Sequence, residues 1–131
     1  MFVDDVLVNG LIEAYNRQNP SDMVSYLADT AKAVWMDLRE ENKEEIKNSF
    51  NWFFSVFPDA TLSVDLFMSQ ENNSLVELTF KGTHKGELFG IQPTNKAVTC
   101  PMVWILAIKD KKISSWREYF NPEPLLNQLK N

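Results

Sequence analysis

The chain has 131 residues, of which 44% are hydrophobic and 12% aromatic, which is enough for one buried core without disulfides. Its net charge is −5 and its lysines are scattered, so we expect no nucleic-acid partner and no binding to anionic membranes. One His and one Cys are too few for a zinc site of the usual type, and we expect no metal and no cofactor. The absence of a basic leader and of a long apolar stretch favours a cytoplasmic protein with a single domain over residues 1–131.

The first half of the chain predicts three helices and one strand. Apolar residues at three- and four-residue spacing predict a helix over 2–17, and Asn19-Pro20 precedes a second, short helix over 22–27. Residues 31–37 predict a strand, followed by a polar link over 38–41. A long helix over 43–56 begins at a capping box formed by Asn42 and Glu45 and ends before Pro58.

The second half predicts an antiparallel meander. Strands are expected over 61–69, 74–87, 97–109 and 113–121, followed by a helical segment over 122–129, and Gly82 is expected to form a bulge or bend. Residues 97–109 are apolar on both faces, which predicts a central strand covered on both sides. Helices followed by a meander indicate an α+β fold rather than a parallel sheet.

Four motifs in chain order resemble those of a known family. They are Phe57-Pro58-Asp59, Gly82-Thr83-His84-Lys85-Gly86, Pro93-Thr94-Asn95-Lys96, and Lys112-Ile113 followed by Tyr119-Phe120-Asn121. In order and spacing they resemble the SnoaL-like (polyketide-cyclase-like, ester-cyclase-like) branch of the nuclear-transport-factor-two-like superfamily. The resemblance implies a curved, mostly antiparallel sheet wrapped on a long helix, forming a cone with an apolar pocket. It also favours a homodimer through the outer face of the sheet, which would cover the second face of strand 97–109.

The chain departs from the family pattern at the usual acid. That acid follows Tyr-x at the end of the last strand, where this chain has Asn121, which cannot take a proton at neutral pH but can hydrogen-bond a carbonyl. Residues 28–37 resemble the segment of ketosteroid isomerase that ends in its general base, which places Asp37 at that position. If the pocket does proton chemistry, we expect Asp37 to be mostly buried, with its pKa raised by apolar surroundings. The alternative is a solvated Asp37 beside Arg39.

The last strand offers further candidates. Tyr119 could donate its hydroxyl to a ligand, and Arg117 and Asn121 share its strand face because strand side chains alternate. The sequence leaves open whether this face lines the cone. Arg117 could instead pair with Glu77 or Glu87 on a neighbouring strand.

Several rings have two interpretations each, as ligand contacts in the pocket or as structural residues of the core. They are Trp35, Trp52, His84 and Trp104.

The sequence leaves three functional classes open. The first is a domain that binds a small, mostly apolar molecule in the cone. The alternative is an enzyme of cyclase, isomerase or hydrolase type, in which an acid removes a proton next to a carbonyl and Tyr119, Asn121 or Arg117 stabilises the oxyanion. A carboxylate at the base of an open pocket would favour the enzyme, whereas a pocket filled by Trp and Phe would favour the third class, a dimeric scaffold.

Overall fold

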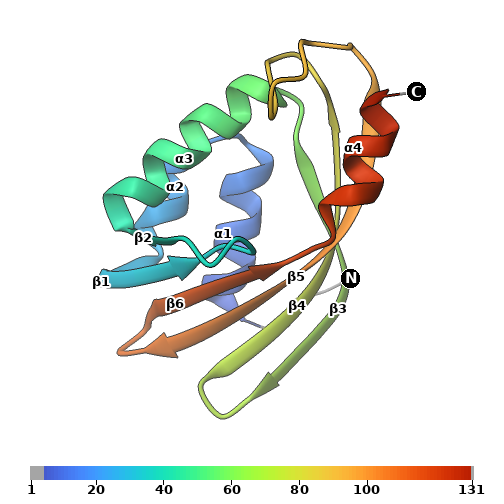
Figure 1. The fold of residues 1–131 in the computed structure, drawn as a ribbon. Coiled ribbons are helices and arrows are strands. Elements are labelled where there is room, and N and C mark those ends of the chain that lie inside the picture. The colour runs from blue at the N-terminus through green and yellow to red at the C-terminus, as the bar shows by residue number, and fades with distance from the viewer. Residues whose placement is uncertain (1–4, 131) are drawn as a thin grey trace.

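The fold is known from a computed structural model that describes residues 5–130 (Figure 1). The helices are α1 (Val6–Asn16), α2 (Pro20–Ser25), α3 (Lys43–Val56) and α4 (Pro122–Lys130). The strands are β1 (Leu27–Val34), β2 (Glu40–Asn42), β3 (Thr61–Gln70), β4 (Asn73–Thr83), β5 (Ala97–Lys109) and β6 (Lys112–Tyr119). This order confirms the predicted α+β class, although residues 2–4 of the first predicted helix lie outside the described residues.

The strands form one six-stranded sheet in the order β2-β1-β6-β5-β4-β3. Strands β3 to β6 pair antiparallel in chain order, as predicted, and β1 pairs parallel with β6. The bulge expected at Gly82 is wrong, because the β4–β5 ladder runs unbroken through Gly82 and the register shift lies on β3, between Val64 and Leu66. A larger residue at Gly82 would crowd its neighbours, because a Cβ there would lie 2.9 Å from the ring of Phe80.

Helices α1, α2 and α3 lie together on one face of the sheet, which curves around them (Figure 1). The predicted capping box starts α3, because Asn42 accepts from the amide of Glu45 and the Glu45 side chain accepts from the amide of Asn42. The buried face of α3 includes Ile46, Phe50 and Phe54, spaced four residues apart. No helix within residues 5–130 is long and apolar enough to cross a membrane.

Helix α4 covers an edge that β6 leaves free. Because the β5–β6 pairing ends at Val103 and Tyr119, the first residues of β5 have no strand beside them on that side. The Gln128 side chain hydrogen-bonds the backbone of Thr99 as a neighbouring strand would. It donates to the Thr99 carbonyl oxygen at 2.8 Å and accepts from the Thr99 amide at 2.9 Å. Such a helix protects the edge from pairing with another chain.

Alternation along β5 and β6 separates an inner from an outer face of the sheet. Trp104, Leu106 and Trp116 are buried on the inner face, towards the helices. Val103 and Ile105 are half-buried on the outer face. The residues of β6 that share the face of Tyr119 therefore point away from the interior of the cone, which settles the alternative that the sequence left open.

Candidate functional site

Aromatic rings fill much of the interior between α3 and the sheet. Their centroids lie 4.7 to 6.3 Å apart, so the rings pack directly against one another. The rings belong to Tyr15, Trp35, Phe50, Phe53, Phe54, Trp104 and Trp116. Rings in mutual contact fill this space, which is the arrangement expected for a dimeric scaffold, so a ligand could enter only by displacing side chains.

Glu118 brings a carboxyl group into this aromatic interior. It lies on the inner face of β6, directly across from Trp104 on β5, whose Nε1 donates to Glu118 Oε1 at 3.0 Å. Desolvation raises the pKa of Glu118 to about 7, although the hydrogen bond from Trp104 works in the opposite direction. A carboxyl group with this pKa can gain or lose a proton at neutral pH, which general acid–base chemistry requires.

Two other ionisable groups lie in the electrostatic range of Glu118. Burial, and to a lesser extent the charge of Glu118, raises the pKa of Tyr15 on α1 well above its usual value. The same two causes raise the pKa of the Cys100 thiol on β5, which is buried. Both groups therefore stay neutral at physiological pH, and Tyr15 keeps its hydroxyl proton available for donation.

A second carboxylate holds Trp35 in place. Glu41, buried on β2, accepts from Trp35 Nε1 at 2.5 Å and from Ser49 Oγ at 2.6 Å, and its Oε2 lies 3.7 Å from Arg39 Nη1. These contacts tie the short strand β2 to α3 and fix the Trp35 ring 5.4 Å from the ring of Trp116. Glu41 therefore acts as a structural anchor for the wall of the interior.

Trp116 contributes a polar atom with no partner. Its indole Nε1 is buried and has no hydrogen-bond partner among the residues that the structure describes. Its ring stacks on Phe50 at 5.5 Å and meets Trp104 edge to face at 4.7 Å. Since a buried N–H without an acceptor costs free energy, an incoming acceptor atom would be favoured there.

Residual exposure shows where the interior meets solvent. Glu118, Phe53 and Phe120 are half-buried. The buried core residues with the highest exposure, 7–8% each, are Trp35, Phe50, Phe54, Met102 and Leu125. These residues come from α3, from the ends of β1 and β6, from the first half of β5 and from α4. We call this region the mouth of the interior.

The structure places Asp37 outside this region, and the expectation that Asp37 is mostly buried is wrong. The chain leaves β1 at Trp35 and turns back, with Leu38 in the left-handed region at φ 66° and the amide of Trp35 bonded to the carbonyl of Arg39. The Asp37 carboxylate, 58% exposed, accepts from the Arg39 amide at 3.1 Å and lies 3.6 Å from Arg39 Nε. This is the solvated alternative that the sequence left open.

The outer face carries the candidates from the end of β6. Arg117 and Asn121 are exposed, and Tyr119 is 49% exposed. The Asn121 Oδ1 accepts from the amide of Glu123 at 3.0 Å, at the start of α4. Strand alternation turns Arg117 and Tyr119 away from the interior, whereas Asn121 lies beyond the end of β6. Tyr119 and Asn121 line a hollow of the sheet, so their contact with a ligand stays a prediction.

Two candidate rings have structural surroundings. Trp52 is 51% exposed on the outer surface of α3, so its expected place in a pocket wall is wrong. His84 is fully buried, and its Nδ1 accepts from the amide of Thr94 at 3.1 Å, which holds the loop between β4 and β5. Trp35 and Trp104 do lie in the interior, and their contact with a ligand stays a prediction.

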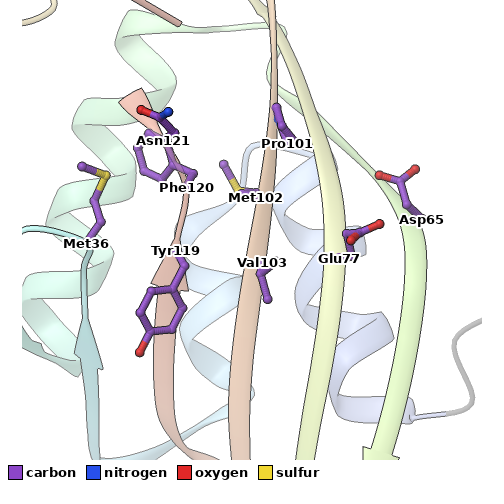
Figure 2. Close-up of a pocket in the computed structure, with 9 residues that line it drawn as sticks. All are labelled: Met36, Asp65, Glu77, Pro101, Met102, Val103, Tyr119, Phe120 and Asn121. Carbon is purple, nitrogen blue, oxygen red and sulfur yellow. The ribbon is translucent and has the colours of Figure 1, made fainter. Parts of the chain in front are cut away.

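Two hollows lie along the sheet, and neither is lined by Glu118, Trp104 or Trp116. The first, of about 560 Å³, is lined by Met36, Asp65, Glu77, Pro101, Met102, Val103, Tyr119, Phe120 and Asn121 (Figure 2). This larger hollow borders the mouth, since Met102 and Phe120 belong to both. The second, of about 390 Å³, lies farther along β4 and β5, beside Thr99 and Gln128. Within residues 5–130, no three His, Cys, Asp or Glu side chains come together as a metal site would require.

Sequence reasoning missed Glu118, although a signal for it exists. Trp116 and Phe120 stand two residues to either side of Glu118, so strand alternation puts the carboxyl group on an apolar face. A single acid on such a face is a candidate for a raised pKa.

Comparisons with known proteins place the chain among similar folds. A family model described as SnoaL-like polyketide cyclase matches residues 5–129. AclR from Streptomyces galilaeus is 26% identical, with a TM-score of 0.87 over 95% of this chain and 78% of that one. IdmH from Streptomyces antibioticus is 19% identical, with a TM-score of 0.84 over 95% and 96% of the two chains.

A third similar structure was solved with a small molecule. It is a hypothetical protein with a ketosteroid isomerase-like fold from Catenulispora acidiphila, in complex with trimethylamine. It is 16% identical, with a TM-score of 0.82 over 95% of this chain and 92% of that one, so it shows likeness of fold alone. No curated protein sequence matches the chain significantly.

Proposed function

This chain belongs to the SnoaL-like polyketide cyclase family, and we propose that it binds a small, mostly apolar molecule at the mouth of its aromatic interior. The observation that carries the proposal is Glu118, a half-buried carboxyl group surrounded by aromatic rings and bonded to Trp104 at 3.0 Å. Apolar walls with a few polar groups are typical of small-molecule sites. The trimethylamine bound by a similar fold supports a ligand of this size.

Acid–base catalysis is the second candidate function, and the pKa of Glu118 favours it. A residue that titrates at about 7 can remove a proton next to a carbonyl and return it later. Tyr15, kept neutral by burial, can donate to the oxyanion that forms. In this proposal, Glu118 takes the role that the sequence had assigned to Asp37.

We further propose a twofold dimer through the outer face of the sheet. Apolar side chains lie on this face, with Val103 and Ile105 half-buried on β5 and Met68 55% exposed on the edge strand β3. Glu77 lies on β4 and Arg117 on β6, on opposite sides of β5. A twofold axis parallel to β5 would bring Arg117 near Glu77 of the partner subunit, so the charges are self-complementary. A cytoplasmic location, which the sequence favours, is part of the same proposal.

Indole resonances offer a direct test of ligand binding. The chain has four tryptophans, and Trp52 on the outer surface of α3 serves as an internal control. We expect small neutral apolar fragments to shift the indole N–H signals of Trp104 and Trp116 and to leave that of Trp52 unchanged. Tryptophan-to-phenylalanine variants assign the four signals. Fragments that shift only residues of the hollows, such as Val103 and Tyr119, would count against the site.

A further inference from the structure

We propose that the ligand of this site is a small hydrophobic cation, an alkyl- or arylammonium ion whose charged head lies beside Glu118 and against the rings of Trp104 and Trp116. The inference rests on the proposed function and narrows its ligand class.

Among residues 5–130, Glu118 forms no ion pair, whereas Glu41 does. Glu41 has Arg39 at 3.7 Å, but the pKa of Glu118 is shaped by desolvation and by the N–H of Trp104, neither of which is a positive charge. The neighbouring Arg117 is exposed on the opposite face of β6 and points away. Because a buried carboxylate is costly unless it is paired, a bound cation would stabilise the ionised form of Glu118.

The rings beside Glu118 suit a cation as well as an apolar group. Trp104 donates to Glu118 through its edge. Trp104 and Trp116 are buried with their centroids 4.7 Å apart, so a cation reaches their faces only after side chains at the mouth move aside. The faces of such rings attract an ammonium group within roughly 6 Å, and indole does so best. A hydrophobic substituent on the cation would gain the remaining aromatic contacts.

The other ionisable groups near Glu118 do not oppose this arrangement. Tyr15 on α1 and Cys100 on β5 both have raised pKa values, so both are neutral at physiological pH. Glu41 on β2 is already paired with Arg39 at 3.7 Å, on the far side of Trp35 and Trp116. The net charge of −5 also favours cations and disfavours anions.

Size is limited by the packing of the interior. The rings contact one another directly, so a ligand must displace side chains at the mouth. Phe53 and Phe120 are half-buried aromatic residues of the mouth. Because they bury less surface than the other rings there, they are the easiest of them for a ligand to displace. A ligand with a single ring or a few alkyl groups meets this limit better than a large one.

A matched series of benzyl compounds tests the inference. Benzylammonium, benzyl alcohol and benzoate share one ring and differ in charge, and calorimetry at about pH 8.5 keeps Glu118 ionised. We expect benzylammonium to bind at least about tenfold more tightly than benzyl alcohol, and benzoate to bind more weakly than both. Glu118→Gln should remove the preference for the cation, because the amide keeps the shape but not the charge. Asp37→Asn, which removes an exposed carboxylate, should keep it.

The outcomes separate the inference from the proposed function. Equal binding of the alcohol and the cation, or a preference that survives in Glu118→Gln, would overturn the inference. Binding of none of the three compounds would also overturn it. The proposed function would still stand if neutral apolar fragments shift Trp104 and Trp116, and would fall if they do not.

Discussion

The indole N–H of Trp104 donates a hydrogen bond of 3.0 Å to the carboxyl group of Glu118, its directly paired neighbour across β5 and β6. The bond favours the ionised form of Glu118, whereas desolvation favours the neutral form and is the larger effect, so the pKa settles at about 7. This pairing gives the inner face of an otherwise apolar sheet one group that changes charge near neutral pH.

Glu118→Gln should stabilise the protein at alkaline pH. The folded-state pKa of Glu118, about 7, lies above its ordinary value of 4.5, so the folded state holds its proton more tightly than the unfolded state. The wild type therefore loses stability as pH rises from about 4.5 to 7, by at most about 3 kcal/mol and by less if solvent screens the group. The amide does not titrate and can still accept from Trp104.

Urea unfolding of both proteins at about pH 4 and pH 8 measures the effect. The free energy of unfolding of the variant, relative to that of the wild type, should increase between these two pH values. A variant whose relative stability does not change with pH would show that Glu118 is not desolvated in the folded state.

Trp104→Phe should raise the pKa of Glu118 further. Phenylalanine removes the only hydrogen bond shown to lower this pKa and leaves an aromatic ring in place. Carbon NMR of the Glu118 carboxyl group through a pH titration gives the value directly. The smaller ring leaves a cavity, so we also expect a loss of stability of about 1–3 kcal/mol. An unchanged or lower pKa would mean that water replaces the indole as donor.

The fold could be predicted from local patterns, because those patterns reflect local physics. Strand 97–109 and helix 43–56 match β5 and α3 in their bounds, since an unbroken apolar run and a capping box mark them clearly. The sequence did not predict strand β2, because a strand of three residues is too short to show alternation. Its buried residue, Glu41, is charged, so the segment looked like a polar link. The position of β2 in the sheet depends on hydrogen bonds from Glu41 to Trp35 and Ser49, which lie outside the strand.

The candidate site was harder to predict than the fold. Family resemblance directed attention to Asp37 and to the face of Tyr119, and both lie outside the interior. Which face of β6 turns inward depends on its register with β5, and the sequence does not determine that register by itself. Trp35 and Trp104 do lie in the interior, since large apolar rings are usually buried.

Asp37→Asn should change little. Its carboxylate is 58% exposed and its ion pair with Arg39 is weak at 3.6 Å, so we expect a loss of stability below about 1 kcal/mol. Thermal unfolding measures stability, and the benzyl series measures binding, which should match the wild type. A clear loss of binding in this variant would return Asp37 to the site.

Ile105→Lys should convert the proposed dimer to a monomer. A lysine at the centre of the outer face places two like charges close to the twofold axis, and the half-buried side chain of Ile105 can be replaced without entering the core. Light scattering at micromolar concentration reads the mass. Trp52→Lys, on the exposed side of α3, is the matched control and should stay dimeric. A wild type that is itself monomeric would refute the dimer.

The most direct test of the central claim is a spectrum of the four indole N–H groups recorded during titration with small apolar fragments. If ligands bind at the mouth beside Glu118, the signals of Trp104 and Trp116 shift with saturation, and that of Trp52 stays in place. The Trp116 signal should move most for fragments that carry an acceptor, since its N–H has no partner among the described residues. Signals of Trp104 and Trp116 that remain fixed, while the fragments shift residues of the outer face, would contradict the account.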